Sequence, residues 1–405
     1  MLRNGKNSLF KMRDDFLKVI VFGTIRSGKT LIGRAINSNP YASVQQEPFF
    51  FYFKICRNIY YRDTLKQKYD YNQPIESDFC IRSDIKNGFR NSLKTLEFNE
   101  SDIAELKKWT IWQQDVAGSD RAPKVNPFIE ELKTGNAVDV LGQLYSILSI
   151  AYPKNDLRCL GFTEAWVDNF IETILSLKET RHKVIHCIRD PRQIIASRNF
   201  GSNSKYDGKY PLLFLIRHWR RSVAYSIINK DNPDYMCVKY EDLVNFPDEW
   251  IMKTCNHLDI PFYEDMMHPE RFVDGLNESW KPNTNFKLGK GFSKSSLAKW
   301  KNVLSEEMVG VIEYLCGKEM DYFCYERSNC DFELINLLSY KEKREDIIEW
   351  LKPYDFDIRN NLELYREITR KYLLDSGDMV CKDIGEGTLD YFFIKKEVFD
   401  IISNC

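Results

Sequence analysis

A glycine-rich segment near the amino end has the residue types and spacing of a phosphate-binding loop. It reads Gly23-Thr24-Ile25-Arg26-Ser27-Gly28-Lys29-Thr30 and matches the pattern G-x-x-x-x-G-K-[ST]. Glycines let the backbone turn tightly so that its N–H groups point at a phosphate, and a following helix N-terminus adds positive charge. The run Leu17–Phe22 before the loop predicts a buried parallel strand, and Thr30–Asn37 after it has the period of a helix. The segment therefore predicts a nucleotide-phosphate site.

A second segment, His182–Arg198, places an arginine and a serine around the junction of a predicted strand and a predicted helix. Its sequence, HKVIHCIRDPRQIIASR, predicts a strand that ends at Arg189 and a helix that Pro191 opens. Ser197 follows Arg189 by eight residues, on the predicted helix. The planar fork of arginine can bind two phosphate oxygens at once, and a surface salt bridge is the other role open to Arg189.

Together these segments resemble those of sulfotransferases that use 3′-phosphoadenosine 5′-phosphosulfate (PAPS). In that family a strand-ending Arg and a Ser eight residues later bind the 3′-phosphate. The family's other segments are R-S-G-[ST]-T-L, L-x-x-N-x-H-P, Y-E-D-L and K-G followed by W-K-N. They correspond here to Arg26-Ser27-Gly28-Lys29-Thr30-Leu31, Ile32–Pro40, Tyr240-Glu241-Asp242-Leu243, Lys290-Gly291 and Trp300-Lys301-Asn302. The resemblance covers about residues 19–325. It departs at Lys29, where the family has Ser or Thr, and at Asn39, where it has His.

The resemblance implies an enzyme that moves a sulfuryl group from PAPS to an acceptor hydroxyl or amine without a metal. It implies that Arg26 and Lys29 stabilise charge on the leaving phosphate oxygen. Tyr240 would contact the adenine side, and Lys290 and Gly291 would close over the nucleotide. The donor-binding set is then Arg26, Ser27, Gly28, Lys29, Thr30, Leu31, Arg189, Ser197, Tyr240, Lys290 and Gly291.

Glu47 is the candidate general base. It stands in Gln45-Gln46-Glu47-Pro48-Phe49, similar to the place of a Glu base in carbohydrate and tyrosyl-protein sulfotransferases. The cytosolic small-molecule branch uses a His instead, and this chain has no His between Thr30 and Arg181. The aromatic run Phe49–Phe53 is expected to raise the pKa of Glu47 by desolvation, although core packing is the more common role for such a run. Glu164 is the alternative base.

Two other functions fit parts of the sequence. Lys29 makes the loop match the phosphate-binding motif of kinases and NTPases that use ATP and Mg²⁺. Asp190 is the candidate carboxylate for binding that Mg²⁺. A nucleotide-binding scaffold without catalysis is the second alternative. The sequence leaves the acceptor open among a sugar, a peptide tyrosine, a lipid and a small metabolite.

Composition limits the partners. The 405-residue chain has a net charge of −1, so no bulk attraction to nucleic acid is expected. Its 11 cysteines include no C-x-x-C pair, which argues against a zinc site and favours a reducing, cytoplasmic location. No window is long and apolar enough to predict a membrane span or a signal peptide.

The elements that must position these residues follow from the same patterns. Further strands are expected at Asp156–Phe162, Lys183–Ile188 and Tyr235–Lys239, which with intervening helices predicts an α/β fold with a P-loop-like parallel sheet. Residues 1–328 would form this domain, with a helical insertion at about 50–150, in which Trp109 and Trp112 would share a helical face. Residues 329–405 would form a small α+β appendage of unknown role. Its expected elements are helices at Lys341–Lys352 and Asn361–Leu374 and a β-hairpin from Met379 to Lys395 around Gly385-Glu386-Gly387.

Overall fold

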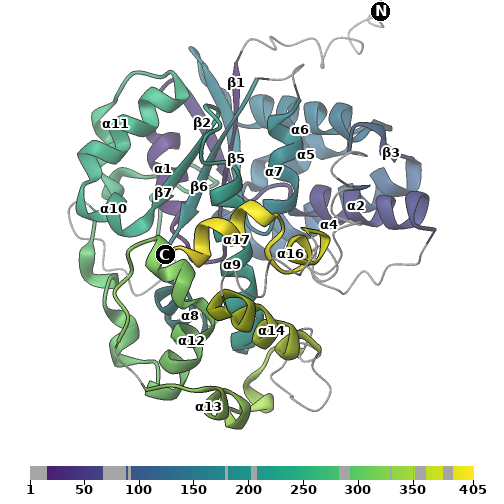
Figure 1. The fold of residues 1–405 in the computed structure, drawn as a ribbon. Coiled ribbons are helices and arrows are strands. Elements are labelled where there is room, and N and C mark those ends of the chain that lie inside the picture. The colour runs from purple at the N-terminus through teal and green to yellow at the C-terminus, as the bar shows by residue number, and fades with distance from the viewer. Residues whose placement is uncertain are drawn as a thin grey trace, which may run out of the picture.

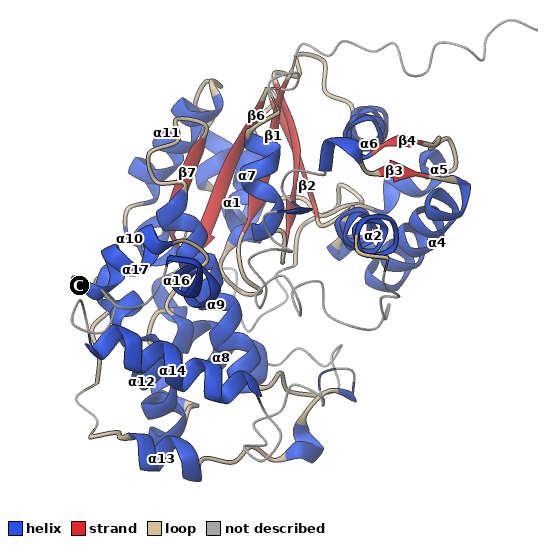
Figure 2. Ribbon diagram, turned by 45° about the vertical axis from the view of Figure 1, so that its right-hand side comes forward, coloured by secondary structure: helices blue, strands red, loops and turns tan. Residues whose placement is uncertain are grey.

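A five-stranded parallel sheet forms the centre of the molecule (Figures 1 and 2). The computed structural model describes residues 16–66, 88–89, 93–177, 181–201, 208–281, 292–328, 331–349, 351, 362–376 and 386–405. The strands are β1 (Leu17–Phe22), β2 (Ala42–Gln46), β5 (Cys159–Glu164), β6 (His182–Ile188) and β7 (Tyr235–Lys239). They lie in the order β2-β5-β1-β6-β7, and every neighbouring pair is parallel. Helices flank this sheet, so the predicted fold class is confirmed.

Alternate residues of the central strand β1 pack against different helical layers. Val19 and Val21 join a core with α1 (Lys29–Ser38) and α11 (Pro247–Leu258). Ile20 and Phe22 join a second core on the other face, with α2 (Phe50–Ile59), α6 (Ala137–Ala151) and α7 (Asp168–Leu175). Because side chains alternate along a strand, a strand covered on both faces reads as a continuous apolar run.

Strand β2 was not predicted, because it lacks such a run. Its sequence is ASVQQ, yet all five residues are buried. The Gln45 amide donates to the side-chain oxygens of Asn37 and Ser43, both at 3.1 Å. Local polar partners therefore satisfy this strand where apolar packing usually would.

The insertion between β2 and β5 is mainly helical and lies beside the sheet (Figure 2). Its α-helices are α2 (Phe50–Ile59), α4 (Glu100–Ala117), α5 (Asn126–Ile129) and α6 (Ala137–Ala151), with a short antiparallel pair β3 (Glu97–Phe98) and β4 (Gly135–Asn136). Asn99 caps α4 reciprocally with Asp102, which fixes where the helix begins. Trp109 and Trp112 share a face of α4, as predicted, with ring centroids 5.7 Å apart.

The remaining helices follow β5. They are α7 (Asp168–Leu175), α8 (Pro191–Asn199), α9 (Leu212–Ile228), α10 (Tyr240–Asn245), α12 (Glu306–Tyr322), α13 (Leu334–Ser339), α14 (Leu362–Ser376), α16 (Glu386–Phe393) and α17 (Lys396–Ser403). A π-helical turn covers Tyr60–Thr64, and 3-10 turns cover Leu93–Thr95, Gly118–Asp120, Pro123–Val125, Glu264–Met267, Pro269–Arg271, Lys294–Ser296, Lys299–Asn302 and Arg344–Asp346.

The carboxyl-terminal segment differs from its prediction in two places. The hairpin is wrong, because helix α16 replaces its second arm; Leu389 and Phe393, four residues apart, are both 1% exposed. Its first arm, Met379–Ile384, lies outside the described residues. The helix predicted at Lys341–Lys352 is also wrong in its described part, because the backbone there pairs with Lys209 through Asp346 and Ile348. The helix predicted at Asn361–Leu374 is observed as α14.

Helices α14, α16 and α17 share one apolar core with α8, α9 and α12. Residues 329–405 therefore cover part of the core, and the boundary at residue 328 stays a prediction. Within the described ranges, no helix is long and apolar enough to cross a membrane.

Candidate functional site

The residues predicted to carry chemistry gather at the carboxyl edge of the sheet. Gly23 follows β1, Glu47 follows β2, Glu164 ends β5, Arg189 follows β6 and Tyr240 follows β7. The strands are parallel and in register, with Phe22 opposite both Glu164 and His186. Their carboxyl ends therefore meet at one edge, where ligands of open α/β sheets bind.

The glycine loop needs its glycines for shape. Gly23 and Gly28 have φ values of +154° and +102°, conformations that side chains rarely adopt. A Cβ on Gly28 would lie 2.3 Å from the Tyr240 ring, and one on Gly23 would lie 2.3 Å from the Cys187 carbonyl oxygen. The loop thus lies tightly against the ends of β6 and β7, and Gly28 leads into α1 without a side-chain cap.

Lys29, Glu47 and Arg121 form a charged cluster beside the loop. The Lys29 ammonium lies 2.7 Å from Glu47 Oε1, and Arg121 pairs with the other Glu47 oxygen. The side chain of Lys29 is 5% exposed, and that of Glu47 is 14% exposed. Burial, and then the charge of Arg121, lowers the pKa of Lys29 from 10.5 to about 7. One carboxylate therefore joins two cations at the end of β2.

Arg121 was missed by the sequence analysis. It lies in the insertion, just after α4 and the turn Gly118–Asp120. A single arginine in a loop carries no motif, and only the fold of the insertion brings it to Glu47. The Gln114 amide donates to the Pro48 carbonyl at 3.3 Å, a contact that joins α4 to the segment after Glu47.

The backbone around Glu47 continues the strand pairing. Its N–H donates to the Thr163 carbonyl at 3.0 Å, and its φ of +39° turns the chain out of the sheet. The preceding Gln46 amide donates to Thr30 Oγ1 at 2.8 Å. The candidate base is therefore tied both to β5 and to helix α1 of the phosphate loop.

The aromatic run after Glu47 belongs mainly to the core. Phe49, Tyr52 and Phe53 are at most 1% exposed, and the Phe49 and Phe53 rings lie 5.5 and 6.3 Å from that of Phe162. The aromatic run was expected to desolvate Glu47. In the structure the Glu47 carboxylate instead pairs with Lys29 and Arg121.

Glu164, the alternative base, is buried completely. Its Oε1 accepts from the Phe49 N–H at 2.7 Å, and its Oε2 is a buried atom without a hydrogen-bond partner among the described residues. Burial raises its pKa from 4.5 to about 7, against the charges of Arg121 and Lys29. Glu164 therefore titrates near neutral pH, yet in this state it does not reach solvent.

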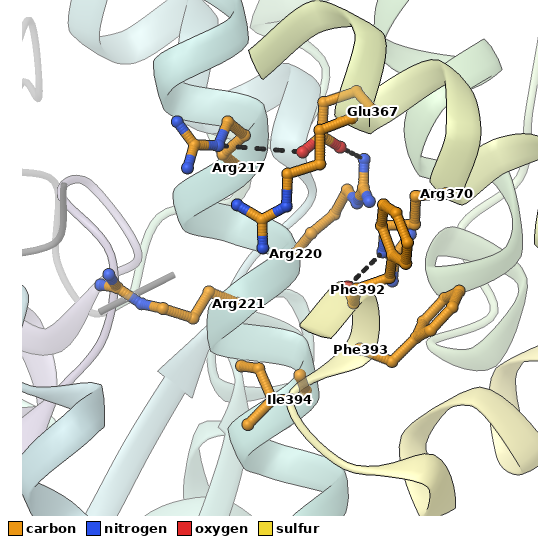
Figure 3. A pocket seen from close by; sticks show the side chains of 10 residues that line it. Arg217, Arg220, Arg221, Glu367, Arg370, Phe392, Phe393 and Ile394 are labelled. Atoms are coloured by element: carbon orange, nitrogen blue, oxygen red, sulfur yellow. Dashed lines mark hydrogen bonds and ion pairs between the residues drawn. The ribbon is translucent and has the colours of Figure 1, made fainter. Parts of the chain in front are cut away.

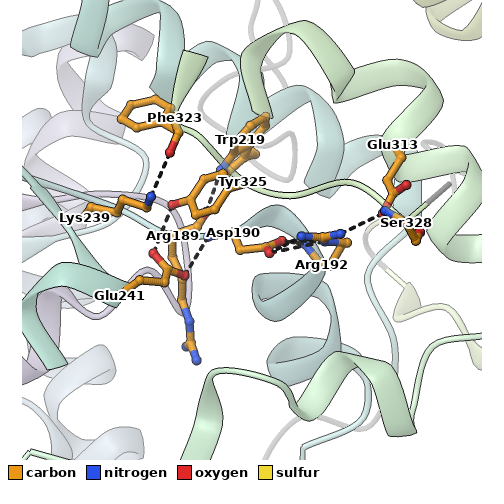
Figure 4. Close-up of polar contacts among 10 residues, drawn as sticks. All are labelled: Arg189, Asp190, Arg192, Trp219, Lys239, Glu241, Glu313, Phe323, Tyr325 and Ser328. Carbon is orange, nitrogen blue, oxygen red and sulfur yellow. Dashed lines mark hydrogen bonds and ion pairs between the residues drawn. The ribbon is translucent and has the colours of Figure 1, made fainter. Parts of the chain in front are cut away.

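Arg189 connects the second predicted segment to the first. Its Nη1 donates to the Arg26 carbonyl at 3.0 Å, and its guanidinium carbon lies 4.0 Å from the centroid of the Tyr240 ring. Its Nε is buried without a partner among the described residues. The Trp219 indole N–H donates to the Arg189 carbonyl at 2.7 Å, while the Arg189 side chain points away from the surrounding polar network (Figure 4). The bond between Arg189 and the Arg26 carbonyl therefore brings the two predicted anion sites into direct contact.

The residues around Arg189 are engaged structurally. Asp190 caps α8 by accepting from the Arg192 N–H at 2.8 Å and pairs with the Arg192 guanidinium at 2.6 Å (Figure 4). The Asp190 carboxylate is thus already engaged by Arg192, which disfavours it as a ligand of a nucleotide-bound metal. Ser197 is half-buried on α8, and the Tyr240 hydroxyl lies 3.0 Å from Ser296 Oγ. Lys290 and Gly291 lie outside the described residues.

Metal-ligating side chains show no grouping in the part of the chain that is described. No three His, Cys, Asp or Glu residues there are arranged to hold an ion. The predicted lack of a metal requirement stays a prediction.

One family model matches part of this chain. The family model of the sulfotransferase domain matches residues 170–323, a range that includes Arg189, Ser197 and Tyr240. The sulfotransferase domain of the olefin synthase from Synechococcus PCC 7002 is similar in structure, with a TM-score of 0.44 and 17% identity over 78% of this chain and 98% of that one. The sulfotransferase domain from the curacin biosynthetic pathway has a TM-score of 0.43 and 15% identity, over 76% and 98%. Retinol dehydratase, solved with androsterone and PAP, has a TM-score of 0.33 and 12% identity, over 81% and 84%. No curated protein matches the chain.

Proposed function

Because the family model of the sulfotransferase domain matches residues 170–323, we propose that this chain is an enzyme of sulfuryl transfer and that its donor is PAPS. The observation that carries the proposal is the direct contact between the two predicted anion sites, where Arg189 donates to the backbone of the glycine loop at Arg26. PAPS carries a phosphosulfate at its 5′ end and a 3′-phosphate, so it needs two cationic sites a few ångströms apart.

The residues present fit such a donor. Ser27 Oγ and Arg189 Nε are buried polar atoms without a hydrogen-bond partner among the described residues, and both belong to the predicted phosphate sites. Buried donors are normally paired, so atoms of this kind suit a ligand. We assign the 5′-phosphosulfate to the loop Gly23–Thr30 and to Leu31, and the 3′-phosphate to Arg189 and Ser197. Tyr240 is assigned to the adenine side, and Lys290 and Gly291 to the cover over the nucleotide.

Glu47 is proposed as the general base. The acceptor oxygen or nitrogen attacks sulfur, the bond from sulfur to the bridging phosphate oxygen breaks, and Glu47 takes the acceptor's proton. The electron pair of the broken bond stays on the phosphate of 3′-phosphoadenosine 5′-phosphate (PAP). Glu47 begins the cycle bonded to Lys29. Lys29 can turn toward the donor phosphate, which frees one oxygen of Glu47 to accept the proton.

Arg26 and Lys29 are proposed to stabilise the leaving phosphate oxygen. Cations placed beforehand where charge develops lower the barrier without reorganisation during the step. With a Glu rather than a His as base, the chain is proposed to be closer to the carbohydrate and tyrosyl-protein branch. We also propose that all donor contacts lie before residue 329, since the assigned residues end with Gly291.

The sulfotransferase-domain match favours sulfuryl transfer over an ATP-dependent reaction. The position of Asp190 supports the same choice, because this carboxylate is held by α8 and Arg192.

We expect PAP to stabilise the protein far more than AMP does, because AMP lacks the phosphate assigned to Arg189. At a concentration of about 100 times its Kd, PAP raises the free energy of unfolding by about 2.7 kcal/mol. Thermal unfolding in a phosphate-free buffer measures this, with ATP plus Mg²⁺ as a third ligand. Arg189→Ala should reduce the PAP response to that of AMP. Arg181→Ala is the matched control, because Arg181 precedes the same strand at the opposite edge and its side chain is 68% exposed. Equal responses to PAP and AMP in the unmodified protein contradict the two-site assignment.

Donor binding should also take up a proton onto Lys29. The pKa of Lys29 is about 7 in the free protein, so at pH 8 most molecules carry a neutral amine. A phosphate dianion beside it favours the ammonium, so binding at pH 8 is coupled to protonation, and the apparent affinity falls as pH rises above 7. Calorimetry of PAP binding at pH 8, in two phosphate-free buffers of different ionisation enthalpy, counts the protons. Lys29→Met should abolish the uptake. Uptake of the same size in Lys29→Met would assign the proton to another group.

A further inference from the structure

A second cluster of arginines lies between helix α9 and the carboxyl-terminal helices, apart from the residues assigned above. Arg217, Arg220 and Arg221 come from α9, and Arg366 and Arg370 come from α14 (Figure 3). They line a cavity of about 40 Å³ together with Glu367 and residues 392–394. Among the described residues that line it, five carry a guanidinium and one carries a carboxylate.

The cluster is buried, which is unusual for so much like charge. Arg220, Arg221 and Arg370 are at most 5% exposed. Buried cations are normally matched by anions, because desolvation makes an unmatched charge costly. Burial, and then repulsion from the like charge of Arg220, lowers the pKa of Arg370 to about 10.

Carboxylates neutralise part of the positive charge of these arginines. Glu367 pairs with Arg220, and its other oxygen lies 3.8 Å from Arg217 Nε (Figure 3). Glu319, which is fully buried, contacts Arg220 Nε at 3.2 Å and Arg370 Nη2 at 2.6 Å. These two carboxylates are shared by three guanidinium groups, and a third carboxylate, Asp168, pairs with Arg221 at 2.8 Å.

Arg370 retains a donor atom that these contacts do not use. Its Nε donates to the Phe392 carbonyl at 3.3 Å and its Nη2 pairs with Glu319. Its Nη1 is buried without a hydrogen-bond partner among the described residues, on a side chain that lines the cavity. A buried guanidinium N–H of this kind suits an anion or an ordered water.

The cavity volume limits the size of the occupant. One water needs roughly 10–15 Å³ on this scale, so 40 Å³ holds about three waters or one compact tetrahedral oxyanion. A nucleotide does not fit. Among compact anions, phosphate and sulfate match the planar fork of arginine best, since it binds two oxygens at once.

The cavity lies on a different face of α9 from the donor site. Trp219 and Ser222 of α9 bond toward the sheet, to the Arg189 carbonyl at 2.7 Å and to His186 at 2.6 Å. Arg220 pairs instead with Glu367 of α14, whereas Arg221 points away from the carboxyl-terminal helices and pairs with Asp168 of α7 (Figure 3). The two sites are therefore separable by substitution.

We propose that this cavity is a second oxyanion site, which binds free phosphate or sulfate through Arg217 and Arg370 and fastens α14 and residues 392–394 to α9. The bound dianion accepts from the Arg370 Nη1 donor, which the contacts of Arg370 with Glu319 and Phe392 leave unused.

The test separates this cavity from the glycine loop, which also binds phosphate. Inorganic phosphate and sulfate are titrated against chloride at equal ionic strength, and the melting temperature is recorded. The titration is repeated on the Lys29→Ala/Arg189→Ala double variant, and on the unmodified protein with excess PAP, which remains usable where the double variant does not fold. We expect the stabilisation by phosphate to persist in both backgrounds.

Substitutions in the cavity should remove this response. In the same backgrounds, we expect Arg370→Gln and Arg217→Gln each to raise the apparent Kd for phosphate by about tenfold or more, since each removes charge-assisted hydrogen bonds. Arg217, with a side chain 11% exposed, is the safer substitution for folding. Arg327→Gln is the control, because Arg327 pairs with Asp321 on the surface and is 49% exposed. A phosphate effect equal to that of chloride, or one that both cavity variants retain in full, overturns the proposal.

Discussion

Glu47→Gln is expected to lower turnover by about 10²–10⁴-fold, the usual contribution of a general base, with donor affinity nearly unchanged. Glutamine keeps the size of the side chain, and its carbonyl oxygen can still accept from Lys29 or from Arg121, but its NH2 group cannot accept from the other cation or take the acceptor's proton. Steady-state assays with PAPS give the turnover, and calorimetry with PAP gives the affinity. A fall in PAP affinity as large as the fall in turnover would assign Glu47 a structural role at the loop.

The chain offers a matched control for this substitution. Glu172 of α7 has a side chain that is 14% exposed, like that of Glu47, and pairs with Lys395 at the same 2.7 Å. Glu172→Gln therefore removes a carboxylate–lysine pair of the same length away from the carboxyl edge of the sheet. It should retain turnover within a few-fold, which separates loss of a base from loss of a buried charge pair.

Glu164→Gln tests the alternative base. The pKa of Glu164 is about 7, so a reaction that used it as base would slow as pH falls below 7, where the carboxyl is protonated. A large loss in Glu164→Gln with little loss in Glu47→Gln would move the base to Glu164. The complete burial of Glu164 and its bond to the Phe49 N–H favour Glu47 instead.

The sequence predicted well those elements of the site that contain a continuous run of apolar residues. Strands β1 and β7 begin and end where the patterns place them, and β6 differs by one residue. Strand β2 was missed because Gln45 and Gln46 obtain their partners from Asn37 and Thr30, which a strand pattern does not contain. Without β2, the sequence placed Glu47 after a helix, although it in fact follows the edge strand.

The parts of the site that form through contacts between residues far apart in the chain could not be predicted from the sequence. Arg121 reaches Glu47 only because α4 lies against Pro48, a relation that no spacing records. The arginines of α9 and α14 appear in the sequence as two polar helix faces, and folding joins them in one cavity. The hairpin prediction failed for a different reason. A local turn signal that contains glycine was present, but packing of Leu389 and Phe393 on the shared core determined the structure instead.

Arg26→Ala and Lys29→Ala should differ in which kinetic constant they change. Arg26 holds the cation position of the family motif, so its loss should lower turnover by about 10²–10³-fold, the usual effect of removing one group that stabilises an oxyanion. Lys29 is an addition to the motif, buried beside Glu47 at 2.7 Å. Its substitution by Ala should raise the Kd for PAP more than it lowers turnover at saturating donor.

The same pair of variants separates the proposed reaction from an ATP-dependent one. In a kinase or NTPase loop the lysine contacts the β- and γ-phosphates and is needed for the chemical step. Such a protein would lose turnover in Lys29→Ala and tolerate Arg26→Ala, the reverse of the pattern expected here. Measuring turnover and PAP affinity for both variants, with ATP and Mg²⁺ assayed in parallel, therefore tests the assignment of the loop. Since Lys29 also contacts the proposed base, Lys29→Ala should release Glu47 to Arg121 alone, and the turnover that remains should still depend on Glu47.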